Sequence, residues 1–195
     1  RILAGPAARR RLAEQGLQPA DVGLIPAAAG GPKGLVLNGL DRFLFGEWLM
    51  RSQQPVHLVG ASIGAWRMAT AARAHAGADA AFRDMAEAYV TQRYDTPPGE
   101  KRPRPDHVSE RFGDILTVWF AGRESEVLSH PRWRLHVVTS RGRHPLLRRE
   151  GRWRTPAGYA GAFASNLVHR PVLGHWLDRV VFSDGRSPLP LPLAD

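Results

Sequence analysis

Cysteine is absent from the 195-residue chain, which excludes disulfide bonds, thiolate metal ligands and cysteine nucleophiles together. Long hydrophobic runs are also missing, since apolar runs such as residues 35–37 and 180–182 fall far short of the roughly 20 residues that a membrane-spanning helix needs. No secretory leader pattern opens the sequence. We therefore expect a cytoplasmic protein. Because the chain begins with arginine instead of methionine and ends in a proline-rich stretch, we also expect a fragment.

Lysine is scarce, so the formal net charge of +9 is carried almost entirely by arginine, and the only lysines are Lys33 and Lys101. A basic balance attracts nucleic acids or anionic lipid headgroups, although genomic base composition alone also produces an arginine bias. The arginines are scattered and form no basic stripe interleaved with aromatic residues, the pattern typical of a nucleic-acid groove. We expect no nucleic-acid partner. The best candidate for a membrane-facing segment is Arg141 to Arg154, which contains Trp153; a solvated loop is its alternative.

The composition, 43% hydrophobic and 23% charged, is that of an ordinary globular protein, and the length suits one domain. Apolar periodicity predicts strands and helices in alternation. The expected strands cover residues 21–26, 56–59, 132–139 and 179–183. The expected helices cover residues 7–16, 35–51, 65–76, 79–92, 106–128 with interruptions at Gly113 and Gly122, and one or two short segments within 157–177. This order indicates an α/β fold with a largely parallel sheet.

The run Gly60-Ala61-Ser62-Ile63-Gly64 has the G-x-S-x-G pattern of a nucleophile elbow. A serine hydroxyl is a weak nucleophile, and a sharp strand-to-helix turn exposes it where a base and oxyanion donors can reach it. An apolar strand precedes the run and an alanine-rich helix follows it, as the motif requires. Gly60 and Gly64 fit because side chains there would collide with the neighbouring strand and helix. A plain turn built from small residues is the alternative interpretation.

A second loop of small residues, Gly30-Gly31-Pro32-Lys33-Gly34, also lies between a predicted strand and a predicted helix. Consecutive glycines allow backbone N–H groups to converge on one anion, here the oxyanion of a tetrahedral intermediate. The spacing of a phosphate-binding loop is absent, because Gly34 is followed by Leu35 instead of a hydroxyl residue. Two strand–loop–helix units in this order indicate a hydrolase site far more specifically than either loop does alone.

Together the two loops resemble the patatin-like phospholipases, which carry a G-G-G-x-[K/R]-G loop after one strand and a G-x-S-x-G elbow after the next. The resemblance spans roughly residues 22–75. It implies a single domain over residues 1–195, incomplete at its C-terminus, with a three-layer sandwich around a largely parallel sheet. Two departures are Ala29 at the first glycine position and Pro32, which has no N–H. The oxyanion donors would then be the Gly30 and Gly31 amides. Lys33 would orient the loop, attract an anionic headgroup or be an ordinary solvated lysine.

The resemblance further implies a Ser–Asp dyad, with the aspartate in a later D-G-[A/G] motif. Asp184-Gly185 is the only D-G pair, and Arg186 follows it where a small residue belongs. The base is therefore either Asp184 or an aspartate beyond residue 195. On this interpretation Ser62 attacks a lipid or phospholipid ester and no cofactor is needed. Peripheral contact with an anionic membrane surface is expected, and the oligomeric state stays open.

Two other functions remain open. An α/β-hydrolase would need a histidine late in the chain, for which His169 and His175 are the candidates. A basic patatin-like module that binds acidic lipid without turnover is the non-enzymatic alternative. The histidine spacing fits no metal motif, so we predict no metal.

Overall fold

The computed structural model describes residues 3–73, 77–100, 103–149 and 151–189. Four strands form one sheet in the order β1-β2-β3-β4, with β1 (Leu24–Ala27), β2 (Val56–Gly60), β3 (Trp133–Gly142) and β4 (Leu177–Ser183). The first three strands are mutually parallel, and β4 pairs antiparallel to β3. The expectation of an α/β fold with a mostly parallel sheet is therefore confirmed.

Helical elements occupy most of the remaining chain. The α-helices are α1 (Pro6–Gln15), α2 (Asn38–Phe43), α3 (Ile63–Arg73), α4 (Ala78–Val90), α5 (Pro105–Phe120), α6 (Glu124–Leu128) and α7 (Arg154–Val168). The tighter or wider turns are η1 (Pro19–Asp21), η2 (Gly31–Leu37), η3 (Leu44–Trp48), η4 (Leu49–Arg51) and η5 (Arg170–His175).

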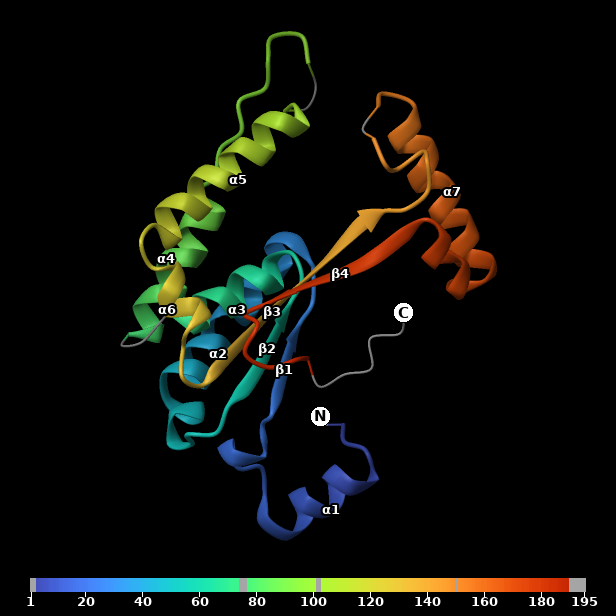
Figure 1. The fold of residues 1–195 in the computed structure, drawn as a ribbon. Helices are drawn as coiled ribbons and strands as arrows, with labels where there is room; N and C mark the ends of the chain where they lie inside the picture. Colours follow the sequence, from blue (N-terminus) through green and yellow to red (C-terminus); the bar gives the residue numbers. More distant parts are fainter. Residues whose placement is uncertain (1–2, 74–76, 101–102, 150, 190–195) are drawn as a thin grey trace.

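The main core lies between the sheet and the layer formed by α2, α3 and α4, which Figure 1 shows on one face of the strands. Along β2, Val56 and Leu58 are completely buried beneath α3, whereas His57 and Val59 face the other side and are half-buried. This alternation is what a strand with one covered face produces. The described helices provide one layer on the sheet, whereas the patatin-like expectation was a layer on each face.

A buried ion pair joins α2 to α3 within this layer. The guanidinium of Arg67 donates to both carboxylate oxygens of Asp41, at 2.6 and 2.8 Å, and both side chains are more than nine-tenths buried. Such a two-pronged pair fixes the angle between two helices more strictly than apolar contact does. The pair thus ties α3 to α2 within the layer.

Some predicted boundaries were wrong for local reasons. The expected helix over residues 35–51 is a continuous helical segment whose pitch changes through η2, α2, η3 and η4. The first strand begins at Leu24 because the preceding Pro19–Asp21 segment forms a tight turn. Gly113 does not interrupt α5, whereas Gly122, at φ 70°, lies in the turn that separates α5 from α6. A left-handed glycine is a common helix terminator.

Candidate active site

Ser62 occupies the turn between β2 and α3, with its backbone at φ 54°. Within the described ranges it is the only residue other than glycine with a positive φ. This conformation costs a residue with a side chain on the order of 1–3 kcal/mol and persists only where the surroundings enforce it. Ser62 is also exposed. A strained, exposed serine at the head of a helix is the geometry that the elbow motif predicts.

Close packing at the two motif glycines, Gly60 and Gly64, enforces the turn. A Cβ added to Gly60 would lie 2.5 Å from the Ala65 Cα, and one added to Gly64 would lie 2.0 Å from the Ala27 carbonyl oxygen. Neither position has room for a side chain, because the first turn of α3 lies directly against the ends of β1 and β2. The predicted reason for glycine at both positions is therefore confirmed.

The two candidate loops meet at the carboxyl edge of the sheet. Ala27 pairs with Gly60 at the ends of β1 and β2, so the loops that follow these parallel strands leave the sheet side by side. The Ala61 N–H donates to the Ala27 carbonyl at 3.1 Å. A Cβ on Gly34 would lie 2.7 Å from the Ile63 side chain. The glycine loop is thus packed directly against the serine turn.

Backbone N–H groups for an oxyanion are available on both sides of this junction. Gly31 has φ 54°, a left-handed conformation that favours glycine, and Pro32 contributes no N–H. The Ile63 N–H opens α3 immediately after Ser62, where the unpaired amides and positive end of a helix dipole favour negative charge. The sequence interpretation named Gly30 and Gly31 but not Ile63. The sequence could have indicated Ile63, because it directly follows the candidate nucleophile, and elbow enzymes use the N–H of that residue as an oxyanion donor.

Lys33 lies on the outer side of the glycine loop. Its side chain is exposed, and among the described residues no carboxylate pairs with it. The ammonium group is therefore exposed where it could attract an anionic headgroup, as one of the sequence alternatives holds.

A cavity of about 490 Å³ opens beside the glycine loop at Pro32. Its other walls come from the end of α4, the segment after it and the start of α5, and all but one are apolar or aromatic: Tyr89, Val90, Gln92, Tyr94, Val108 and Phe112. The rings of Tyr89 and Tyr94 each contact Phe112, with centroids 6.3 and 6.1 Å apart. The volume falls in the usual range for small-molecule sites.

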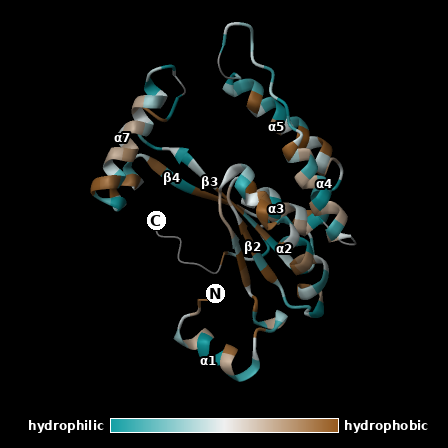
Figure 2. Ribbon diagram, turned by 180° about the vertical axis from the view of Figure 1, so that it is seen from behind, coloured by the Kyte–Doolittle hydropathy of each residue, from teal (hydrophilic) through white to brown (hydrophobic). Residues whose placement is uncertain are grey.

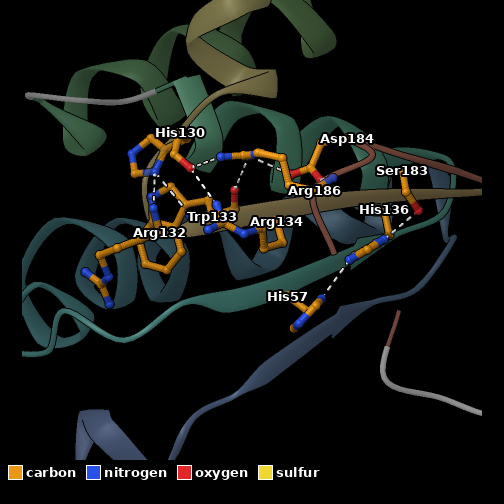
Figure 3. Close-up of polar contacts among 9 residues, drawn as sticks. All are labelled: His57, His130, Arg132, Trp133, Arg134, His136, Ser183, Asp184 and Arg186. Atoms are coloured by element: carbon orange, nitrogen blue, oxygen red, sulfur yellow. Dashed lines mark hydrogen bonds and ion pairs between the residues drawn. The ribbon is translucent and has the colours of Figure 1, made fainter. Parts of the chain in front are cut away.

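Asp184, one candidate for the base, is directed elsewhere. Ser183 lies opposite His136, and because β4 runs antiparallel to β3, Asp184 continues toward the amino ends of the neighbouring strands. Its buried carboxylate accepts from Arg186 at 2.6 Å (Figure 3). Arg186 also donates to the carbonyls of His130 and Trp133.

The hydroxyl of Ser62 has no hydrogen-bond partner within the part of the chain that the structure describes. The two late histidines do not supply one. His169 directly follows α7 and His175 ends η5, and both side chains are exposed. Figure 1 shows α7 at the far end of β3 and β4. The described residues thus bring the candidate nucleophile and the candidate oxyanion donors together without placing a base on Ser62.

A polar relay that the sequence did not reveal crosses the second face of the sheet. His57 Nδ1 lies 2.8 Å from His136 Nε2, and His136 Nδ1 lies 2.7 Å from the Ser183 hydroxyl (Figure 3). Burial lowers the pKa of both histidines below the usual 6.5; Arg134 lowers the pKa of His57 further, His57 lowers that of His136, and Asp184 opposes both shifts. Both imidazoles are therefore held toward their neutral forms at neutral pH.

Comparison of this chain with protein-family models, with curated proteins and with solved structures gives no match. Across the described ranges no three histidine, aspartate or glutamate side chains gather closely enough to hold a metal ion. None of the helices seen there is long and apolar enough to cross a membrane. The resemblance to patatin-like phospholipases therefore depends on the two loops and their geometry.

Proposed function

We propose that the chain is a serine hydrolase of lipid acyl esters, of the patatin-like type, with Ser62 as its nucleophile. The observation that carries the proposal is the strained, exposed Ser62 turn with the Gly30–Gly34 loop packed against it. The neighbouring cavity supports a substrate with an apolar acyl chain, because its walls are nearly all apolar or aromatic. The proposal includes a cytoplasmic location, and it takes the described sheet with its one helical layer as part of a patatin-like three-layer sandwich.

In the proposed reaction the Ser62 oxygen forms a bond to the ester carbonyl carbon while its proton passes to an aspartate. The carbonyl electron pair moves to the oxygen, which accepts hydrogen bonds from the Gly30, Gly31 and Ile63 amides. Collapse of this intermediate breaks the ester bond, and the leaving alcohol takes the proton from the aspartate. Water then repeats the sequence on the acyl-enzyme and regenerates Ser62.

Hydrolysis of p-nitrophenyl esters of graded chain length tests the proposal. Ser62→Ala should lower turnover to about the uncatalysed level, a fall of at least about 10³-fold, while Ser183→Ala serves as a matched serine control with unchanged turnover. Hydrolysis that survives in Ser62→Ala would overturn the assignment. Asp184→Asn then tests the candidate base within the chain: loss of turnover with an unchanged urea midpoint would assign the base to Asp184, and retained turnover would exclude it.

A lipid-binding module without turnover is the second candidate, favoured by the unpartnered Ser62 hydroxyl. It predicts no ester cleavage by a folded wild-type chain. Salt-sensitive binding to anionic vesicles in that same chain would then replace the enzymatic proposal.

A further inference from the structure

The segment from Arg141 to Arg179, named here the α7 arm, includes the end of β3, α7, η5 and the start of β4. Figures 1 and 2 show α7 at the end of these two strands, apart from the layer of α2, α3 and α4. The arm lies outside both candidate loops, residues 30–34 and 60–64. Its surface therefore needs a separate explanation.

The inner face of α7 is closely packed on its own arm. A Cβ on Gly158 would lie 2.6 Å from Leu147, and one on Gly161 would lie 2.3 Å from the ring of Trp176. The Trp176 indole N–H also donates to the Ser165 hydroxyl at 3.0 Å. The glycines allow this close approach, so the direction in which the opposite face points is fixed.

The outer face of α7 is apolar and exposed. Tyr159, Phe163 and Leu167, spaced four residues apart and thus on one side of the helix, are 57%, 65% and 70% exposed. Residues 155–168 include no charged side chain. Trp153, just before the helix, is 78% exposed, and the guanidinium of Arg152 lies 5.6 Å from its ring centre. A contiguous apolar stripe of this kind marks an interaction surface.

The arm that carries the stripe is strongly basic. The arm contains eight arginines against Glu150 and Asp178, a formal charge of +6 out of +9 for the whole chain. Three of these arginines border the helix in sequence: Arg152 lies two residues before α7, Arg154 is its first residue, and Arg170 lies two residues after its end. An uncharged helix face bordered at both ends by long cationic side chains is the pattern of a helix that lies in a membrane interface.

We propose that the α7 arm binds the surface of an anionic lipid bilayer, with α7 lying in the plane of the interface. Tyr159, Phe163 and Leu167 enter the boundary between headgroups and acyl chains, and Trp153 anchors at the same depth. The flanking arginines bind lipid phosphates, to which their planar guanidinium groups are suited. This inference depends on the arm alone and goes beyond the proposed hydrolysis.

Vesicle flotation with the full chain carrying Ser62→Ala tests the proposal without turnover. The protein should float with vesicles that contain roughly 30% phosphatidylserine, and remain in solution with phosphatidylcholine alone. Raising the salt concentration to about 1 M, where the screening length falls to roughly 3 Å, should release much of it. Adding Phe163→Ser should weaken binding about tenfold.

Val118→Ser is the matched control, because Val118 is an apolar residue on α5 that is 82% exposed; it should bind vesicles like the parent. Equal binding to both vesicle types, or equal loss in both serine variants, would overturn the proposal. So would a dimer in light scattering that Phe163→Ser dissociates, since a second copy would then cover the stripe. Failure of ester hydrolysis leaves these results unaffected, which keeps the two proposals separable.

Discussion

Gly64→Ala tests the close packing beneath the Ser62 turn by adding a single methyl group. The added methyl group would lie 2.0 Å from the Ala27 carbonyl oxygen and 2.5 Å from its carbon. Both are backbone atoms of β1, so no side-chain rotation relieves the overlap. Either the first turn of α3 moves away from the sheet or the end of β1 shifts.

The expected loss follows from the cost of overpacking a closely packed site, about 1–3 kcal/mol. For a chain of this size that corresponds to a fall in Tm of roughly 2–12 °C. A movement of α3 also displaces Ser62 and the Ile63 amide relative to the glycine loop. Because a misplacement of about 1 Å costs on the order of 10²-fold in rate, the rate of covalent labelling at Ser62 should fall more than stability alone explains.

Urea unfolding and the rate of labelling by a fluorophosphonate measure the two effects. Gly113→Ala is the control, because Gly113 lies within α5 with open space around its Cα. This change should leave labelling unchanged and raise stability by about 0.5–1 kcal/mol. If Gly64→Ala matched the control in both measurements, the close contact between α3 and β1 would be refuted.

Three further predictions concern other parts of the fold. Asp41→Asn, which leaves its buried guanidinium partner uncompensated, should lower the free energy of unfolding by about 3–5 kcal/mol, and a urea midpoint close to that of wild type would contradict this. Burial lowers the pKa of His57 and His136, so below pH 6.5 the unfolded chain binds more protons than the folded chain. The free energy of unfolding should therefore fall as the pH drops through that value. An equally steep fall in the double variant His57→Gln and His136→Gln would contradict this. Val108→Trp, which fills part of the cavity beside the glycine loop, should shift ester preference toward shorter acyl chains, and an unchanged chain-length profile would exclude the cavity as the acyl site.

The Ser62 turn could be predicted from the sequence because its causes are local. Gly60 and Gly64 are required by contacts within a few residues and with the adjacent strand, and those contacts recur wherever a strand turns sharply into a helix. The alternation of strands and helices was predictable for the same reason, since apolar periodicity reports which face of each element is covered.

Other features depend on contacts between distant parts of the chain. The direction of β4 follows from how residues 143–176 return to β3, which no local pattern specifies. The relay from His57 through His136 to Ser183 joins three strands, so single histidines in the sequence gave no sign of it. Asp184 binds Arg186 only two residues further on, but the direction of Arg186 depends on the distant carbonyls of His130 and Trp133, to which it donates.

Mass spectrometry of the folded chain after exposure to a fluorophosphonate tests the central claim most directly. We expect one covalent adduct, on Ser62, that disappears in Ser62→Ala and persists in Ser183→Ala. An adduct elsewhere, or no adduct on a chain that is demonstrably folded, would contradict the assignment of Ser62 as an activated nucleophile.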